Sequence, residues 1–382
     1  MSLKVSRRGR VPPFIVMDVL RAANERQSAG ASVLHLEVGQ PSAGAPAGAI
    51  AAARAALETD NLGYTEAFGR ADLSRRIVRH YKEEYGIDVD RGRIVVTTGS
   101  SGAFLLAFLA AFDEGDKVAL AAPGYPAYRN ILTALGIEVV TIDVGDATNF
   151  QPAPALLDRI SGRLDGLIVA SPANPTGTMI HAAEMAALTA YCRDRGVRLV
   201  SDEIYHGITY GRRAETALAF DPGAIVINSF SKYYSMTGWR LGWMVVPEPL
   251  LRSIECLAQN FYISPPTLSQ VAAAAAFDCK DELEANVQRY ATNRALLLRE
   301  LPKAGFGRMA SAEGAFYLYA DVADMTNDSA EFCRRMLAET GVAATPGVDF
   351  DPGRGHRFIR FSFAGATEDM AEAARRLVAW RR

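Results

Sequence analysis

The sequence predicts an α/β protein whose large domain holds a mostly parallel, doubly wound central sheet, with a smaller α+β domain after it. Two observations carry this expectation. Short apolar runs alternate with helix-length segments, as strands that are buried on both faces of a parallel sheet do. Beyond about residue 285 the pattern changes to amphipathic helices with few strands. Ligands of doubly wound sheets bind at the carboxyl ends of the strands, so site residues are expected directly after the runs.

The apolar runs mark the expected strands. In the large domain they cover residues 94–97, 118–121, 167–170, 199–201, 225–227 and 244–246, and in the small domain residues 315–319 and 358–363. We therefore expect a large ligand-binding domain over residues 39–285 and a small α+β domain over residues 286–382. The N-terminal segment, residues 1–38, is expected to pack with the small domain.

Bulk composition argues against several classes of protein. The 382 residues suggest two or three domains, and 49% hydrophobic with 22% charged residues is ordinary for a globular protein. A formal charge of −2 does not suit nucleic acid binding, and the Arg7, Arg8 and Arg10 cluster is interpreted as a solvated terminus. The sequence shows neither a signal peptide nor a membrane-spanning apolar run. We expect a cytoplasmic protein whose partners include neither membrane nor nucleic acid.

Cysteine and histidine spacing argues against a metal site. The four cysteines lie far apart without a C-x-x-C pair, and the five histidines show no H-E-x-x-H spacing. No metal is predicted. The cysteines are expected to be buried thiols in a reducing compartment.

The most informative segment is N-S-F-S-K-Y-Y-S-M-T-G-W-R-L-G-W at residues 228–243. The hydroxyls of Ser229 and Ser231 and the guanidinium of Arg240 offer donors and positive charge to a phosphorylated ligand. Lys232 supplies a primary amine, which can form a Schiff base with a carbonyl group. The alternative, a solvated surface lysine, does not suit the neighbouring S-F-S and G-W-R sequences.

Other polar residues follow the expected strands. Gly99-Ser-Ser-Gly102 forms an expected turn before a helix over residues 103–112, and such a turn can direct N–H groups at an anion, although simple helix capping is the alternative. Tyr125 offers an aromatic face for a flat ring, or else is a core tyrosine. Asn174 lies in the S-P-A-N-P-T-G segment, whose prolines predict a loop.

Two buried charges need partners. Asp202 ends a buried run, with Tyr205 three residues later, and a buried acid without a partner loses its charge; a helix N-cap is the alternative for Asp202. Arg360 lies among apolar residues of an expected strand, where its guanidinium can bind a carboxylate with two hydrogen bonds.

These motifs and their spacing resemble those of class I/II aminotransferases, which belong to the fold type I enzymes that depend on pyridoxal 5′-phosphate (PLP). The landmarks run in family order from Gly39 to Arg360 and so cover most of the chain. The resemblance implies the PLP-dependent transferase fold type I and PLP as the cofactor.

The resemblance also implies roles for these residues. Lys232 holds PLP as an internal aldimine and then shuttles a proton between Cα and C4′. Asp202 keeps the pyridine nitrogen protonated. Asn174 and Tyr205 hydrogen-bond the phenolic oxygen, and Tyr125 stacks on the ring.

The remaining implied roles concern the phosphate, the substrate and the neighbouring subunit. Phosphate-binding residues are Ser100, Ser101, Gly102, Ser229, Ser231 and Arg240. Arg360 binds the substrate α-carboxylate beside Asn174 and the backbone of Gly39, for which an ordinary turn glycine is the alternative. Tyr64 reaches the phosphate of the neighbouring subunit, which implies a homodimer.

The function implied is that of an aminotransferase that moves an amino group between an L-amino acid and a 2-oxo acid. A PLP-dependent C–S lyase of the same fold is the alternative, and release of pyruvate and ammonia from cystathionine without an acceptor would favour it. A PLP-sensing regulator needs a DNA-binding module ahead of the fold, for which there is no room before Gly39.

Substrate identity is left open by the sequence. Related aspartate enzymes carry a lysine at the position of Ser101, which argues against aspartate. Phe14, Tyr262 and the aromatic residues of segment 313–319 suit a pocket for apolar or aromatic side chains, although core packing explains them equally well.

Overall fold

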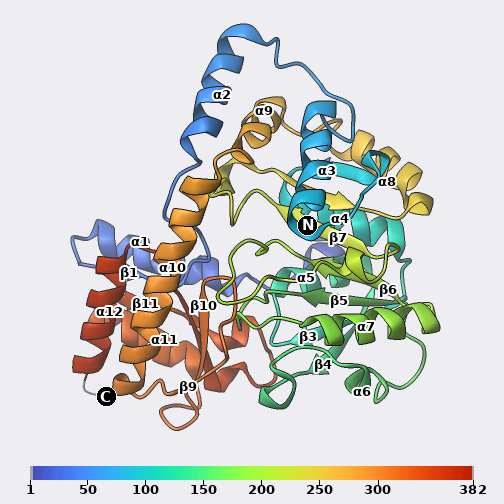
Figure 1. Ribbon diagram of the computed structural model, residues 1–382. Helices are drawn as coiled ribbons and strands as arrows, with labels where there is room; N and C mark the ends of the chain where they lie inside the picture. The colour runs from blue at the N-terminus through green and yellow to red at the C-terminus, as the bar shows by residue number, and fades with distance from the viewer. Residues whose placement is uncertain (1–2, 381–382) are drawn as a thin grey trace.

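The computed structural model describes residues 3–380, which form a large mixed sheet and two smaller sheets (Figure 1). The seven strands of the large sheet lie in the order β2 (Ile94–Thr97), β8 (Gly242–Val245), β7 (Ile225–Ser229), β6 (Arg198–Asp202), β5 (Gly166–Ala170), β3 (Lys117–Ala122) and β4 (Glu138–Asp143). Only β8 runs antiparallel to its neighbours in this sheet, and the other neighbouring pairs are parallel. The predicted α/β class with a mostly parallel sheet is confirmed.

Helices cover both faces of this sheet, because successive strand residues point to opposite sides. Val118 and Leu120 of β3 pack with α4 (Gly99–Ala111), α5 (Pro126–Leu135) and α8 (Glu248–Phe261). Ala119 of β3 and Leu167 of β5 belong to the opposite core, with α3 (Ala71–Tyr85), α7 (Ala182–Arg195) and α9 (Thr267–Ala276). Burial on both faces explains why the strands are apolar throughout.

The structure differs from the sequence expectations at two places in this sheet. The edge strand β4 was not predicted, because half of its residues E-V-V-T-I-D are exposed and they do not form a continuous apolar run. The expected turn over residues 99–102 is instead the first turn of α4, which begins at Gly99 directly after Thr98. Small residues without proline allow the helix to start at once, so the prediction that it begins at Ala103 is wrong.

A four-stranded antiparallel sheet forms the core of the C-terminal part, in the order β12 (Thr345–Pro346), β13 (Phe358–Ser362), β10 (Tyr317–Asp321) and β9 (Arg308–Met309). The expected strand 315–319 begins two residues later than predicted, since Ala315 has a φ of 55°, which a strand cannot accommodate. Strand β1 (Leu34–His35) pairs in parallel with β11 (Val342–Ala343), so the N-terminal segment lies against this part of the chain.

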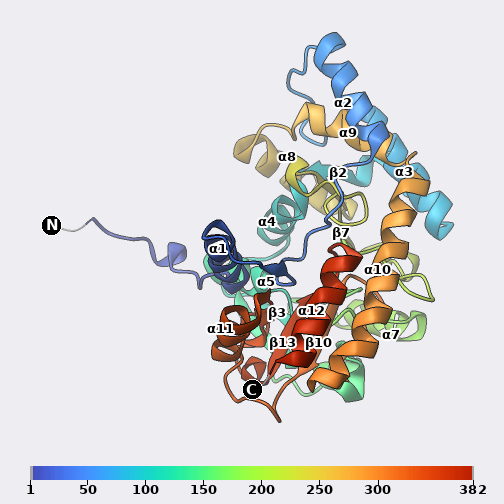
Figure 2. The same cartoon turned by 90° about the vertical axis from the view of Figure 1, so that its left-hand side faces the viewer.

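The remaining helices connect and cover these sheets. They are α1 (Ile15–Ser28), α2 (Ala47–Thr59), α6 (Pro154–Leu157), α10 (Lys280–Glu300), α11 (Ser329–Thr340) and α12 (Thr367–Ala379). Short 3₁₀ turns are η1 (Arg7–Gly9), η2 (Arg91–Arg93), η3 (Asp146–Thr148), η4 (Ala217–Ala219), η5 (Thr237–Trp239), η6 (Leu301–Ala304), η7 (Gly347–Asp349) and η8 (Gly355–Arg357). In Figure 2 the described residues before η1 extend away from the body, whereas Arg8 of η1 pairs with Glu114 at 3.2 Å.

Helix α10 joins the two main sheets. Leu283 near its start packs in the core of the large sheet, whereas Val287, Tyr290 and Leu297 pack in the core of the four-stranded sheet. The outermost residues of the first and last expected domains, 1–2 and 381–382, lie outside the described residues. Across residues 3–380 no helix is both long enough and apolar enough to cross a lipid bilayer.

Candidate active site

A cavity of about 220 Å³ lies at the carboxyl ends of the parallel strands, between the large sheet and β13. It brings together most of the site residues predicted from the sequence, namely Gly39, Ser100, Ser101, Tyr125, Asn174, Asp202, Tyr205, Ser231, Lys232, Arg240 and Arg360. These residues come from segments that are far apart in the chain. The topology of the sheet therefore places the expected groups around one space.

Lys232 follows β7 by a few residues and carries its amine into this cavity. Its Nζ donates a 2.6 Å hydrogen bond to the carbonyl oxygen of Gly39. Burial, together with the cations Arg360 and Arg240, lowers the pKa of Lys232 to about 8, while Asp202 opposes the shift. A fraction of the amine is therefore neutral, and so nucleophilic, near physiological pH.

Gly39 is needed for close packing at this point. A Cβ atom built on Gly39 would lie 1.7 Å from the hydroxyl oxygen of Tyr317. No side chain fits there, so the backbone of residue 39 can approach both Tyr317 and Lys232. This steric requirement favours a role at the site over an ordinary turn glycine.

Asp202 ends β6 and is only 3% exposed. Its carboxylate accepts hydrogen bonds from the hydroxyl of Tyr128 and, at 3.1 Å, from the backbone N–H of Ile204. Burial raises the pKa of Asp202 to about 6, although both hydrogen bonds and Lys232 oppose the shift. Asp202 makes no salt bridge within residues 3–380, and Lys232 is the one cation there that lowers its pKa, so a cationic group in the cavity can compensate its charge.

Arg360 lies in the middle of β13 and is 3% exposed. It donates from Nη1 to Asn174 Oδ1 at 2.8 Å and from Nη2 to the carbonyl of Glu37 and to Thr345 Oγ1. The ring of Tyr317 lies under the guanidinium, with Cζ 4.4 Å from the ring centroid. These contacts hold the guanidinium in one orientation beside Asn174, as recognition of a carboxylate requires.

Two phenols meet below Arg360. The hydroxyl oxygens of Tyr205 and Tyr317 are 2.7 Å apart, and both rings are buried. Tyr205 is a site residue expected from the sequence, whereas Tyr317 was expected only as part of the aromatic segment 313–319. The Tyr205 hydroxyl therefore has a fixed hydrogen-bond partner beside the cavity.

The first turn of α4 and the segment after β7 offer groups that could hold an anion. Ser100 and Ser101 lie where the positive end of the α4 dipole reaches the cavity, and Arg240 lies beside them. Gly99 has a φ of +79°, and a Cβ atom there would lie 2.6 Å from Arg240 Nη2. A glycine at this position is therefore required for the arginine to reach the helix terminus.

Three predicted site residues do not line the cavity. Ser229 lies behind Ser231 and donates to its hydroxyl at 3.0 Å. Gly102 lies in the first turn of α4, where its missing side chain leaves room for Thr98. Tyr64 is 82% exposed, in the segment between α2 and α3.

Sequence reasoning missed several residues at the cavity. Tyr128, whose hydroxyl donates to Asp202, lies three residues after Tyr125 in the A-P-G-Y-P-A-Y segment, residues 122–128. Val16 and Met17 line the cavity together with Phe14, which was expected. Tyr262, considered for the same wall, does not line the cavity within the described chain.

A larger cavity of about 690 Å³ lies beyond the end of β6 and is lined by Tyr85, His206 and Trp243 among others. Its charged side chains pair with one another, as Glu84 does with Lys280 at 3.0 Å. None of the predicted site residues contributes to its lining in the part of the chain that the structure describes. The smaller cavity is therefore the candidate active site.

A buried polar cluster surrounds Glu203, the residue directly after Asp202. Glu203 is fully buried and accepts from the backbone N–H of Ala217 at 2.8 Å and from the hydroxyls of Ser201 and Thr216. Its second oxygen has no hydrogen-bond partner among residues 3–380 and lies 3.6 Å from His206 Nδ1. Burial raises the pKa of Glu203 to about 8 and lowers that of His206 to about 3.

This cluster predicts how stability depends on pH. Because the pKa of Glu203 is about 8 in the folded protein and ordinarily 4.5, its contribution to stability is fully present below about pH 4.5 and is lost progressively as the pH rises to about 8. Replacing it with glutamine removes this loss. As the pH rises from about 5.5 to about 8.5, we expect the free energy of unfolding of the wild type to fall by about 3 kcal/mol more than that of Glu203→Gln.

Urea denaturation of the two proteins at both pH values measures this difference. Titration of Asp202 and His206 occurs in both proteins and so largely cancels. Parallel pH profiles would contradict the raised pKa of Glu203.

Comparison with known proteins agrees with the geometry of the site. Residues 31–377 match the family described as aminotransferase class I and II. The chain is 53% identical to a valine–pyruvate aminotransferase of Mycobacterium tuberculosis, over 100% of this chain and 99% of the relative. It is 32% identical to a (5-formylfuran-3-yl)methyl phosphate transaminase of Methanocaldococcus jannaschii, over 95% of each chain.

Solved structures show the same fold. A crystal structure of an aminotransferase from Mycobacterium tuberculosis matches with a TM-score of 0.97 and 52% identity, over 99% of both chains. Aspartate aminotransferase from Thermus thermophilus with maleate matches with a TM-score of 0.93 and 28% identity, over 99% of this chain and 100% of the other.

Proposed function

Because the chain belongs to the class I and II aminotransferase family and is a PLP-dependent aminotransferase, we propose that it transfers the amino group of valine, or of a similar apolar L-amino acid, to pyruvate. The 53% identity to a valine–pyruvate aminotransferase over the whole chain carries this proposal. The comparisons favour transamination over the C–S lyase and the regulator considered from the sequence.

The wall of the cavity supports an apolar substrate. Phe14, Val16, Met17 and Val38 line it, and the ring of Phe14 meets that of Tyr125 edge to face at 5.7 Å. Within residues 3–380, the only cations that line the cavity are Lys232, Arg240 and Arg360, which the proposal already assigns to the amine, phosphate and α-carboxylate roles. A side-chain carboxylate would thus lack a cation of this chain, and burying it unpaired is costly.

A panel of amino donors tests the substrate. Valine, alanine, phenylalanine and aspartate are each assayed with pyruvate and with 2-oxoglutarate as acceptors. We expect kcat/KM for valine with pyruvate to exceed that for aspartate by at least about 10-fold, since differential contacts of this kind are worth 1–3 kcal/mol or more. Aspartate as the best donor would overturn the substrate assignment but not the reaction class.

The family implies PLP, and the residues of the cavity fit this cofactor. When bound, PLP supplies a carbonyl carbon that reacts with amines and a ring that withdraws electrons. Asp202, buried without a cationic partner in the described chain, suits the pyridine nitrogen. Ser100, Ser101 and Ser231, with Arg240 beside them, suit the phosphate.

The protein's own groups then perform the following steps. Arg360 binds the substrate α-carboxylate through two N–H groups and so orients Cα towards Lys232. Lys232 Nζ, with its pKa lowered to about 8, accepts the proton from Cα and later returns one as a general acid. Tyr205, Asn174 and Tyr125 hold the cofactor ring in place, and Gly39 keeps the backbone close to the substrate carboxylate.

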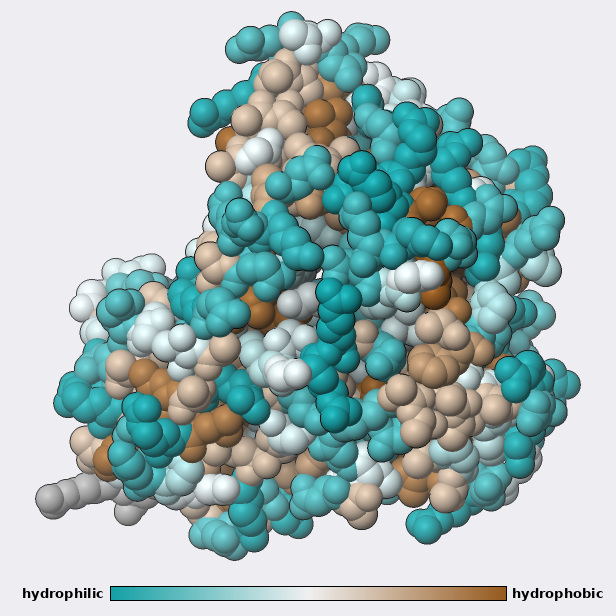
Figure 3. All heavy atoms as spheres, in the orientation of Figure 1, coloured by the Kyte–Doolittle hydropathy of each residue, from teal (hydrophilic) through white to brown (hydrophobic). Residues whose placement is uncertain are grey.

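We also infer a homodimer in which Tyr64 reaches the phosphate of the neighbouring subunit. Exposed apolar side chains support it: Leu57 on α2 is 62% exposed, Phe261 51% and Ile263 49%. Tan and brown atoms gather over α2 at the top of Figure 3. Exposed apolar patches of this kind often mark a protein interface.

Two further proposals concern organisation and location. The division into residues 1–38, 39–285 and 286–382 is supported by the separate cores of the two main sheets and by the pairing of β1 with β11. A cytoplasmic location is supported by the free thiols of Cys192, Cys256, Cys279 and Cys333.

A further inference from the structure

The segment between α2 and α3, residues 60–70, is held firmly although its most prominent side chain faces solvent. Tyr64 is 82% exposed, and it makes no hydrogen bond among residues 3–380. Fixing each backbone residue costs about 1–2 kcal/mol of conformational entropy. An ordered loop around an exposed aromatic side chain therefore needs its own internal supports.

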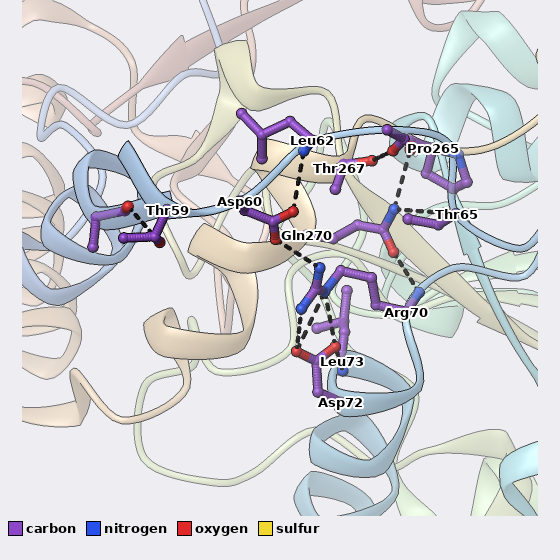
Figure 4. A network of polar contacts seen from close by, with 12 residues as sticks. Thr59, Asp60, Leu62, Thr65, Arg70, Asp72, Leu73, Pro265, Thr267 and Gln270 are labelled. Atoms are coloured by element: carbon purple, nitrogen blue, oxygen red, sulfur yellow. Dashed lines mark hydrogen bonds and ion pairs between the residues drawn. The ribbon is translucent and has the colours of Figure 1, made fainter. Parts of the chain in front are cut away.

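Gln270, on α9, is the central support. It is fully buried, and its Oε1 accepts from the backbone N–H of Arg70 at 2.7 Å (Figure 4). Its Nε2 donates to Thr65 Oγ1 at 3.2 Å and to the carbonyl of Pro265 at 3.0 Å. One buried amide thus links the end of the loop, its middle and the segment before α9.

The backbone of the loop is shaped to this amide. Gly69 has a φ of +93°, and a Cβ atom there would lie 2.7 Å from Gln270 Oε1 and 2.7 Å from Val96 Cβ. A side chain at position 69 would therefore displace either the amide or strand β2. The absence of a side chain at Gly69 therefore leaves the space that Gln270 needs.

Further hydrogen bonds hold the part of the loop that carries Tyr64. Thr267 Oγ1 donates to the carbonyl of Gly63 at 2.6 Å, one residue before Tyr64. Asp60 accepts from the N–H of Leu62 at 3.0 Å and from the guanidinium of Arg70 at 3.3 Å (Figure 4). Both neighbours of Tyr64 are thus tied to the body, Gly63 through Thr267 and Thr65 through Gln270.

We propose that Gln270 is a positioning residue that orders the 60–70 loop, so that Tyr64 completes the phosphate site in a second copy of this chain. This inference rests on the proposed dimer. The second copy is the chosen partner because exposed apolar side chains lie near the loop. Leu57 is on α2, directly before it, and Phe261 and Ile263 come just before Ser264, whose hydroxyl accepts from the backbone N–H of Thr65 at 3.3 Å. Gln270 itself does not line the cavity of its own subunit.

The first experiment measures PLP binding to apoprotein by absorbance titration. Gln270→Leu removes the amide at similar volume, and Tyr64→Phe removes only the hydroxyl. Asn293→Leu is the matched control, because Asn293 is also a fully buried amide and donates to the carbonyls of Phe363 and Gly365, at 3.0 and 2.9 Å. We expect the Kd for PLP to rise about 10-fold for Gln270→Leu and Tyr64→Phe, and less than about 2-fold for the control.

The second experiment tests whether Gln270 acts across the interface. Gln270→Leu subunits are mixed with Lys232→Ala subunits, and PLP affinity and turnover are measured on the purified hybrid dimer. One of its two sites combines an intact Lys232 with a loop from the subunit that retains Gln270. We expect this site to regain wild-type PLP affinity, so that the hybrid dimer shows about half the activity of the wild-type dimer. If Gln270 acted within its own subunit's site, neither site of the hybrid would be restored.

The outcomes separate this inference from the proposal on which it rests. An unchanged Kd for Tyr64→Phe would overturn the role of Tyr64 and this inference with it. A raised Kd for Tyr64→Phe with an unchanged Kd for Gln270→Leu, or a hybrid that shows no recovery, would overturn the role of Gln270 alone. If Gln270→Leu does not fold, Thr267→Val, which loses the bond to Gly63, takes its place in both experiments with the same expected results.

Discussion

Replacing Lys232 with alanine is expected to lower kcat by about 10⁴-fold or more, because the variant loses both the amine that binds the cofactor carbonyl and the group that moves the Cα proton. General acid–base catalysis alone contributes about 10²- to 10⁴-fold. The structure supports both roles, since Lys232 Nζ lies in the cavity with its pKa lowered to about 8. Single-turnover and steady-state assays with valine and pyruvate measure the loss.

Chemical labelling gives an independent readout. Borohydride treatment of the wild-type holoenzyme should fix PLP covalently to the peptide that contains Lys232, and the alanine variant should yield no labelled peptide. Lys280→Ala is the control, because Lys280 is an exposed lysine whose amine pairs with Glu84 at 3.0 Å. It should be labelled and should turn over like the wild type. A label on another lysine, or turnover retained in Lys232→Ala, would refute the assignment.

Replacing Asp202 with asparagine is expected to lower kcat by about 10²- to 10⁴-fold. Breaking a buried charge pair by removing one partner costs about 3–5 kcal/mol, and each 1.36 kcal/mol corresponds to a factor of ten in rate. Asp202 is 3% exposed and its carboxylate accepts hydrogen bonds only from Tyr128 and Ile204 within residues 3–380. The neutral amide keeps the volume but cannot hold a proton on the pyridine nitrogen.

The visible absorption spectrum of bound PLP distinguishes this effect from a loss of folding, because it responds to the protonation of the ring. Asp351→Asn serves as the control, since Asp351 is also 3% exposed and accepts backbone N–H bonds from Gly353 and Arg354, but it does not line the cavity. We expect a changed spectrum and slow turnover for Asp202→Asn only. Equal losses in both variants would mean that Asp202 has a structural role.

Most of the central sheet could be predicted because its strands are buried on both faces. Runs such as 94–97 and 167–170 contain almost no polar residues, and the structure places them in β2 and β5. Strand β4 is an edge strand with half of its residues exposed, so its sequence lacks that signal. The start of α4 was misplaced because glycine and serine suit a turn and the first turn of a helix equally well.

The site was predictable where its residues belong to local motifs. Asp202 ends strand β6, Asn174 and Lys232 follow β5 and β7 within a few residues, and the carboxyl ends of parallel strands meet at one edge of the sheet. Tyr317 and Gln270 have no comparable signal. Each is distinguished only by what it touches, Tyr205 in one case and Thr65 in the other.

The sequence by itself determined the doubly buried strands of the central sheet, the order of the motifs and the chemical groups available, because these depend on residue type and local spacing. Only the tertiary structure decided that Arg360 donates to Asn174, 186 residues earlier in the chain, and that Gln270 holds the loop of Tyr64. The physical reason is that burial, hydrogen-bond partners and shifted pKa values depend on neighbours in space, which chain folding alone brings together.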